Sequence, residues 1–234
     1  MARPTKTSLG LKLGTFLPST PILPALTGTP KIWAAGDSTT AGTGSTDAGA
    51  YRTPLDAMMA AAGDMPRQWV GTNQSPTGFF HYGNSSWTIA LLTAQIATQM
   101  STHTPDIGLV QIGRNDMTTD PDAAAALGLY ATMLAQFWTS RPTMRLICCH
   151  PTPDEDATIY ARTVTFRAGL TAVLQASSHY AAGLLLECRG GKSLSPFTRA
   201  HIGDGVHPND QGYVMEAADI FPVMRNAYGL PASF

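Results

Sequence analysis

Five brief apolar segments, each four to six residues long, alternate along this chain with longer segments of helical periodicity. Apolar segments of this length are typical of parallel strands that helices cover on both faces. The strand candidates are Ile32–Ala35, Gln68–Gly71, Ile107–Ile112, Arg145–Cys149 and Leu184–Glu187. The helix candidates are Tyr51–Ala62, Thr88–Gln99, Asp122–Trp138, Ala157–Ser177 and Asp210–Tyr228, the last of them bent or broken near Pro222.

This alternation predicts a three-layer α/β/α sandwich around a central five-stranded parallel sheet, since right-handed crossovers place helices on both faces. We expect residues 31–234 to form this single domain and residues 1–30 to form an extended arm. Pro18, Pro21 and Pro24 interrupt any helix in that arm. Ligands of such sheets bind beyond the carboxyl ends of the strands. Polar residues that directly follow a predicted strand are therefore the candidates for a site.

The charge composition argues against two classes of partner. The net charge is −1 and only 13% of the residues are charged, so nothing favours nucleic acid or an anionic membrane. No apolar run is long enough to span a bilayer, and Lys12 interrupts the only stretch resembling an export signal. Both a cytoplasmic protein and a secreted protein with its signal removed fit the sequence. The arm and the low charge are compatible with a homo-oligomer.

Cys148, Cys149 and Cys188 have no spacing typical of a zinc site or a disulfide framework. We expect them to be small buried hydrophobic residues within strands. A strained disulfide between the two adjacent cysteines is the alternative.

Ser38 follows the first predicted strand, and Asp204 and His207 share a loop near the other end of the chain. A serine in this context can simply cap a helix. It becomes a nucleophile when a histidine takes its proton and a carboxylate orients that histidine. Among six histidines, His207 is selected because an acid precedes it by three residues in a loop bounded by glycines and a proline. The three residues predict acyl transfer.

Asn115 follows the strand candidate Ile107–Ile112. It can form a local turn through its own side chain, or it can direct its amide at an oxyanion. Arg114, beside it, either attracts an anionic substrate or pairs with a surface carboxylate.

Together, Ser38, Asn115 and the Asp204/His207 pair, in this order, resemble the SGNH (GDSL) hydrolase superfamily over about residues 31–225. Three further blocks are similar to its acetyl xylan esterase branch. They are Gly49-Ala50-Tyr51-Arg52-Thr53-Pro54-Leu55, His81-Tyr82-Gly83-Asn84-Ser85-Ser86-Trp87-Thr88-Ile89 and Asp204-Gly205-Val206-His207-Pro208-Asn209-Asp210-Gln211-Gly212-Tyr213.

The resemblance implies a flavodoxin-like sandwich, ester hydrolysis without a metal or organic cofactor, and an oxyanion hole with three donors. These donors are the backbone N–H groups of Ser38 and Ser86 and the side-chain amide of Asn115. Ser86 stands where the family usually has glycine, and a serine tolerates that place easily only if its φ is negative.

Other residues receive supporting roles from the resemblance. Tyr82 replaces an acidic residue common in that branch, and Tyr82 and Arg114 are the candidate substrate contacts. Arg52 is assigned to brace the loop around Ser38, and Asp37 and Gly113 are also assigned to structural support.

We therefore expect a serine esterase that removes short acyl groups, with acetyl foremost, from a carbohydrate. The carbohydrate preference rests on the resemblance to one branch alone. One alternative is a broad short-chain esterase, lipase-like or thioesterase-like. The other is a carbohydrate-binding or assembly module that keeps the SGNH shell without catalysis.

Overall fold

The sheet of this protein is built around strand β1, which has neighbours along both of its edges. The computed structural model describes residues 23–119, 122–152, 155–189 and 199–231. The strands are β1 (Lys31–Gly36), β2 (Gln68–Val70), β3 (Asn73–Gln74), β4 (Phe80–Gly83), β5 (Ile107–Gln111), β6 (Arg145–Cys149) and β7 (Leu185–Cys188). The order across the sheet is β3-β4-β1-β5-β6-β7, and β2 also pairs with β1.

Two short strands share one edge of β1. Strand β2 pairs in parallel with Lys31–Trp33, and β4 pairs in parallel with Ala35 and Gly36. The parallel sheet therefore has five strand positions, although it contains more than five strands. The predicted α/β sandwich is confirmed, and each of the five predicted segments contains or overlaps an observed strand.

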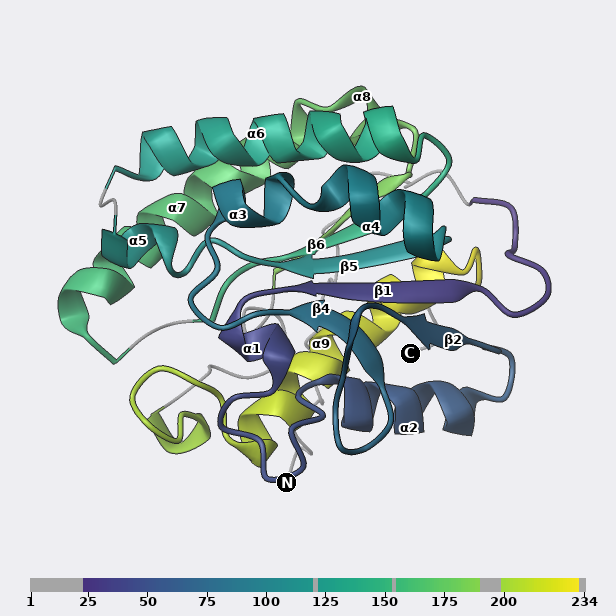
Figure 1. The fold of residues 1–234 in the computed structure, drawn as a ribbon, viewed down its shortest axis with the longest axis horizontal. Helices are drawn as coiled ribbons and strands as arrows, with labels where there is room; N and C mark the ends of the chain where they lie inside the picture. The colour runs from purple at the N-terminus through teal and green to yellow at the C-terminus, as the bar shows by residue number, and fades with distance from the viewer. Residues whose placement is uncertain (1–22, 120–121, 153–154, 190–198, 232–234) are drawn as a thin grey trace, which may run out of the picture.

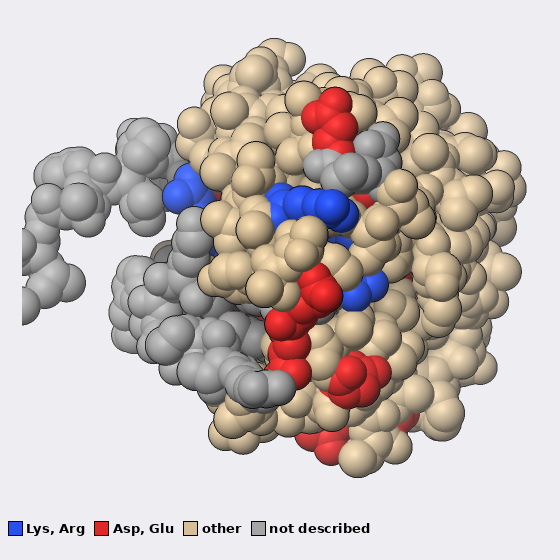
Figure 2. Space-filling model, turned by 90° about the vertical axis from the view of Figure 1, so that its left-hand side faces the viewer, with Lys and Arg blue, Asp and Glu red and all other residues tan. Residues whose placement is uncertain are grey.

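The parallel strands all end at the same side of the molecule, where α1 (Ser38–Ala41) follows β1 (Figure 1). Figure 2 faces this side. Most of the described surface there carries no charged side chain, and a small group of basic residues lies beside a row of acidic ones. A sparsely charged surface around the strand ends fits the low share of charged residues in the sequence.

Helices cover both faces of the sheet (Figure 1). One face carries α3 (Ile89–Thr93), α4 (Ile96–His103), α6 (Ala123–Ser140) and α7 (Ala157–Gln175), and the other carries α2 (Arg52–Ala62) and α9 (Asp210–Ala227). The short helices α5 (Asp116–Thr119) and α8 (Ser178–Ala181) and the 3₁₀ turn at Arg199–His201 complete the described elements.

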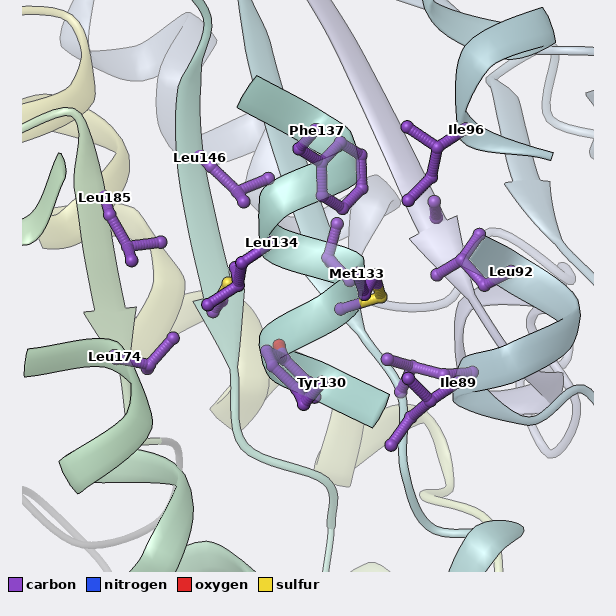
Figure 3. Packing of buried hydrophobic residues seen from close by; sticks show 14 of the residues in the cluster. Ile89, Leu92, Ile96, Tyr130, Met133, Leu134, Phe137, Leu146, Leu174 and Leu185 are labelled. Atoms are coloured by element: carbon purple, nitrogen blue, oxygen red, sulfur yellow. The ribbon is translucent and has the colours of Figure 1, made fainter. Parts of the chain in front are cut away.

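Alternate residues of each strand supply two separate cores, as the two-residue period of a strand requires. Trp33 and Ala35 pack under α3, α4, α6 and α7, whereas Ile32 and Ala34 pack against α2 and α9. Figure 3 shows the first core, with Met133 and Phe137 of α6 lying among side chains of the sheet and of α3.

Two predicted helices differ in detail from the structure. The segment Thr88–Gln99 is two helices, α3 and α4, with Ala94 and Gln95 between them. Of the two predicted alternatives at Pro222, a bend or a break, the break is wrong, because α9 continues through this residue. Proline removes one helical N–H, but Ile220 and Met224 on either side are buried in the second core and hold the helix in place.

The part of the predicted arm that the structure describes, from Leu23 on, packs on the domain. The carbonyl of Pro24 accepts a hydrogen bond from Arg145 Nη2 at 2.5 Å, and the N–H of Leu26 donates to the carbonyl of Tyr228 at 2.9 Å. Residues 1–22 lie outside the described residues, so the extent of the arm stays a prediction. Among the helices that are described, none has the length and apolar character to cross a membrane.

All three cysteines are buried with free thiols, so the adjacent pair forms no disulfide. Cys149 and Cys188 are register partners on β6 and β7.

Candidate active site

Ser38 is presented by a sharp turn between β1 and α1. The strand ends at Gly36, and a Cβ at that position would lie 2.0 Å from the carbonyl oxygen of Gln111, so only glycine fits beside β5. Asp37 is the N-cap of α1, and its carboxylate accepts the N–H of Thr39 at 2.9 Å. Ser38 therefore begins a helix directly at the carboxyl edge of the sheet.

His207 connects Ser38 to Asp204 through both nitrogens of its ring. Its Nε2 lies 2.8 Å from Ser38 Oγ, and its Nδ1 lies 2.8 Å from Asp204 Oδ2. The other carboxylate oxygen of Asp204 accepts the N–H groups of Val206 and His207, at 3.0 and 2.8 Å. A carboxylate on Nδ1 requires a proton there, which leaves Nε2 as the acceptor that faces the serine hydroxyl.

Asp204 is held in its charged form by these hydrogen bonds. Partial burial raises its pKa, but the hydrogen bonds from the ring and backbone of His207 and from Val206 outweigh it and lower the pKa to about 2. The carboxylate is therefore ionised at neutral pH and can stabilise a positive charge on the imidazole. Its side chain is 52% exposed, so solvent screens part of this effect.

Asn115 lies at the same edge with its amide held from two sides. Its Nδ2 donates to the carbonyl of Trp87 at 3.0 Å, and its Oδ1 accepts from Arg114 Nη1 at 3.3 Å. Trp87 belongs to the loop Asn84–Trp87, which follows β4. The other end of this loop is tied to β1, since the N–H of Asn84 donates to the carbonyl of Gly36 at 3.1 Å. One of the two amide hydrogens on Nδ2 is not engaged by Trp87.

Ser86 lies between these two anchors of the loop, and its φ is +63°. The sequence left open whether its φ is negative or positive. The value is in the left-handed region, which glycine enters without strain and serine does not. The backbone at this position thus has a conformation that favours glycine, although the residue is serine.

Asp37 is buried behind Ser38, and this burial dominates its protonation. Burial outweighs the hydrogen bonds from Thr39 and the charges of Arg114 and His207, all of which lower the pKa of Asp37, so that its pKa is raised to about 6. Arg114 itself is half-buried.

The predicted substrate contact Tyr82 is mainly a core residue. It is 8% exposed, stacks on Trp33 with ring centroids 5.9 Å apart, and packs in a T-shaped pair with Trp87 with ring centroids 5.2 Å apart. Phe80 is exposed, but it begins β4 and thus lies away from the end that borders the site.

Arg52 and Gly113 occupy positions that fit structural support. Arg52 is fully buried, with Nη1 donating to the carbonyl of Thr40 and Nη2 donating to that of Ala48 at 3.4 Å. Gly113 has a φ of +118°, and a Cβ there would lie 2.7 Å from the ring of Phe166.

Two polar features near the site were missed from the sequence. Glu216 of α9 is buried and accepts a hydrogen bond from Gln111 Nε2 at 3.3 Å. His150 is buried with Nε2 2.8 Å from Glu187 Oε1. Neither acid lies in a motif, so no local signal marks them. Within the described ranges, no cluster of three or more His, Cys, Asp or Glu residues could hold a metal ion.

A serine, an imidazole and a carboxylate joined by hydrogen bonds, at the carboxyl edge of a parallel α/β sandwich, form the arrangement of a hydrolase that works through an acyl-enzyme. Comparison with family models agrees. The chain belongs to the GDSL-like lipase/acylhydrolase family, whose model matches residues 34–215. The protein is accordingly an ester hydrolase.

Solved structures show the same fold. A family 3 carbohydrate esterase from Clostridium thermocellum is 26% identical, with a TM-score of 0.73 over 83% of this chain and 94% of that one. A family 3 carbohydrate esterase from Talaromyces cellulolyticus is 23% identical, with a TM-score of 0.68 over 84% and 96%. A lipase/acylhydrolase from Enterococcus faecalis is 19% identical, with a TM-score of 0.61 over 84% and 96%. A search of curated proteins finds no match.

Proposed function

We propose that the enzyme removes short acyl groups, with acetyl as the expected group, from hydroxyls of a carbohydrate. Ser38 is the nucleophile, His207 the general base and then acid, and Asp204 the residue that orients the imidazole. The observation that carries the proposal is the unbroken chain of two 2.8 Å contacts from Ser38 Oγ through His207 to Asp204. Both contacts lie within the 2.6–3.2 Å reach of proton transfer.

The reaction follows from the positions of the protons on Ser38, His207 and Asp204. His207 Nε2 takes the proton of Ser38 Oγ as that oxygen bonds to the ester carbonyl carbon, which gives a tetrahedral oxyanion. The ionised Asp204 stabilises the imidazolium. The imidazolium then gives its proton to the leaving sugar oxygen, and the C–O bond of the ester breaks. In the second half, the same nitrogen takes a proton from a water molecule as the water oxygen bonds to the acyl carbon. It then returns that proton to Ser38 Oγ as the bond between the acyl carbon and Oγ breaks and the acid leaves.

The oxyanion is expected to be held by three N–H donors. The proposed set is the backbone N–H of Ser38 at the start of α1, the Nδ2 hydrogen of Asn115 that does not point at Trp87, and the backbone N–H of Ser86. Support comes from the double anchoring of the Asn84–Trp87 loop to Gly36 and Asn115. Donors that are fixed before the reaction lower the barrier because no reorganisation is needed.

The carbohydrate assignment is supported by likeness and by charge. The Clostridium thermocellum protein described as a family 3 carbohydrate esterase has the same fold over nearly its whole length. The few charged side chains on the face in Figure 2 suit a neutral, hydroxyl-rich substrate. Arg114 is the proposed substrate contact at the rim. Tyr82 would contribute only the edge that Trp33 and Trp87 leave uncovered.

Hydrolysis of p-nitrophenyl acetate tests the chemistry. Ser38→Ala and His207→Ala should each lower kcat/KM by several orders of magnitude, and a fluorophosphonate should label the wild type but not Ser38→Ala. Near-native rates in both variants would overturn the mechanism.

The substrate class requires a second measurement. Acetate release from acetylated xylan and chitin oligomers, next to a p-nitrophenyl ester series of increasing acyl length, should show a preference for acetyl and activity on a polysaccharide. A preference for butyryl or longer esters without release from any polysaccharide would favour the broad short-chain esterase instead.

A further inference from the structure

The residues after Ser38 are held by a tyrosine from the helix that follows His207. Tyr213 of α9 is fully buried, and its hydroxyl lies 2.7 Å from the carbonyl oxygen of Thr43 and 3.1 Å from that of Thr39. A hydroxyl has one proton, so it donates to one carbonyl at a time, and Thr43 is the nearer. The turn that bears the serine is thus bonded to the helix that the histidine precedes.

A second contact joins the same two segments at the surface. Asp210, the first residue of α9, accepts the backbone N–H of Thr46 at 2.9 Å and the Thr46 hydroxyl at 2.8 Å. Both groups of Thr46 are therefore satisfied by one carboxylate. Because Asp210 and Thr46 are exposed, this contact is worth less than that of Tyr213.

The third contact is a close approach of backbone to backbone. Gly44 has a φ of +89°, and a Cβ at this position would lie 2.4 Å from the carbonyl oxygen of Pro208 and 3.1 Å from the Cβ of His207. The loop after Ser38 therefore rests directly against the backbone of the catalytic histidine. Any side chain at Gly44 has to displace one of the two segments.

We propose that Tyr213, Asp210 and Gly44 form a clamp that sets the distance between Ser38 Oγ and His207 Nε2. They are positioning residues, since none of them contacts the reacting atoms. His207 is carried by a loop outside the sheet, so its place relative to Ser38 depends on contacts between the two loops. Displacement of a reacting group by about 1 Å can cost up to roughly 100-fold in rate. The inference rests on the proposed roles of Ser38 and His207.

Matched substitutions separate this role from general stability. Tyr213→Phe removes the hydroxyl of the clamp, and Tyr228→Phe removes a buried hydroxyl near the far end of α9 that donates to the carbonyl of Pro66 at 2.9 Å. We expect Tyr213→Phe to lower kcat for p-nitrophenyl acetate by about 10-fold with KM changed by less than about 2-fold. Tyr228→Phe should leave both parameters at the wild-type values.

A glycine pair tests the close approach in the same way. Gly44→Ala and Gly63→Ala both place alanine at a positive φ, but a Cβ at Gly63 meets nothing within 4 Å. The strain of the backbone is therefore similar, and only Gly44→Ala pushes on His207. We expect kcat to fall about 100-fold in Gly44→Ala and to stay unchanged in Gly63→Ala.

Each kcat is calculated per molecule of folded protein, and circular dichroism at the assay temperature gives the folded fraction. The rate of fluorophosphonate labelling should fall in parallel with kcat. Thr46→Val, an exposed substitution, provides a test if Gly44→Ala does not fold, with an expected fall in kcat of about 2- to 5-fold. Wild-type kcat in Tyr213→Phe and Thr46→Val would overturn the clamp. If Ser38→Ala also kept its activity, the proposed function would fail as well; an inactive Ser38→Ala would confine the failure to the clamp.

Discussion

The guanidinium of Arg114 donates a hydrogen bond to the side-chain oxygen of Asn115, at 3.3 Å, while the amide nitrogen of Asn115 donates to the carbonyl of Trp87 at 3.0 Å. A donor on one side and an acceptor on the other leave the amide a single orientation. Its nitrogen is thereby directed to the loop that contains Ser86. A preset donor at this place is what an oxyanion needs.

Asn115→Ala should therefore lower kcat by about 10²–10³-fold with a smaller effect on KM, because one oxyanion donor is lost. Asn115→Asp, which keeps the shape but brings a negative charge toward the oxyanion, should lower kcat at least as much. Steady-state kinetics with p-nitrophenyl acetate measures both. A kcat within about fivefold of the wild type in Asn115→Ala would remove the amide from the proposed donors.

Asp204→Asn tests the orientation of the imidazole. The remaining carbonyl oxygen can still accept the backbone N–H groups of Val206 and His207, so the loop should keep its turn. The side-chain NH2 group, which then faces Nδ1, can donate but cannot accept, so the ring favours the tautomer whose Nε2 is protonated and cannot act as a base. We expect kcat to fall on the order of 10³–10⁴-fold with little change in thermal stability.

Asp122→Asn is the matched control for that substitution. Asp122 is an exposed N-cap of α6 that accepts the N–H of Ala124 at 2.9 Å, and asparagine caps a helix equally well. Its kinetics should equal those of the wild type. Comparable losses in the two variants would mean that the loss in Asp204→Asn does not come from its contact with His207.

The sheet could be predicted from the sequence because its central strands are continuous apolar runs. Strands β3 and β4 could not, since Asn73-Gln74 and Phe80–Gly83 are short and carry polar residues. Their place is set by pairing with each other and with the end of β1, which no local pattern encodes. The continuity of α9 through Pro222 likewise depends on packing against the sheet.

For the site, the motifs located Ser38, Asn115, Asp204 and His207, which the fold brings to one edge. What the motifs could not give is the environment of each residue. Tyr82 lies in the motif block but packs between two tryptophans, and nothing in its own sequence context distinguishes that from an exposed ring. Tyr213 was visible as part of a motif, yet its contacts with the loop after Ser38 arise only from the tertiary fold.

Glu216 should make stability fall as the pH rises. Burial raises its pKa from its ordinary value of 4.5 to about 8, so the folded protein binds this proton more tightly than the unfolded chain does. The stability that comes from this tighter proton binding is fully present below pH 4.5 and is lost as the pH rises from 4.5 through 8. The slope in that window is at most about 1.4 kcal/mol per pH unit for one group.

Glu216→Gln removes this titration. Urea unfolding should show the variant gaining free energy of unfolding relative to the wild type between pH 5 and pH 8. Glu187→Gln is a control of opposite sign, because the hydrogen bonds from His150, Arg189 and Thr171 outweigh burial and lower the pKa of Glu187 to about 2. That variant should be less stable than the wild type at pH 7. A pH-independent difference for Glu216→Gln would mean that the acid is ionised in the folded protein.

Ser86→Gly should stabilise the protein without a loss of activity. Serine at a φ of +63° carries a strain of about 1–2 kcal/mol that glycine does not, and the greater entropy of glycine in the unfolded chain offsets about half of the gain. We expect the free energy of unfolding to rise by about 0.5–1 kcal/mol and kcat to stay within about twofold, since glycine keeps the direction of the N–H. Thr104→Gly is the control, with a φ of +46° at the C-cap of α4, and should raise the free energy of unfolding while kcat and KM stay unchanged.

Ser86→Val tests the N–H of Ser86 as an oxyanion donor. The branched side chain of valine disfavours this φ further, so the variant should lower kcat because the N–H is turned away from the oxyanion. If Ser86→Val kept the wild-type kcat while remaining folded, the N–H of Ser86 would not be an oxyanion donor, and the oxyanion would rest on Ser38 and Asn115 alone.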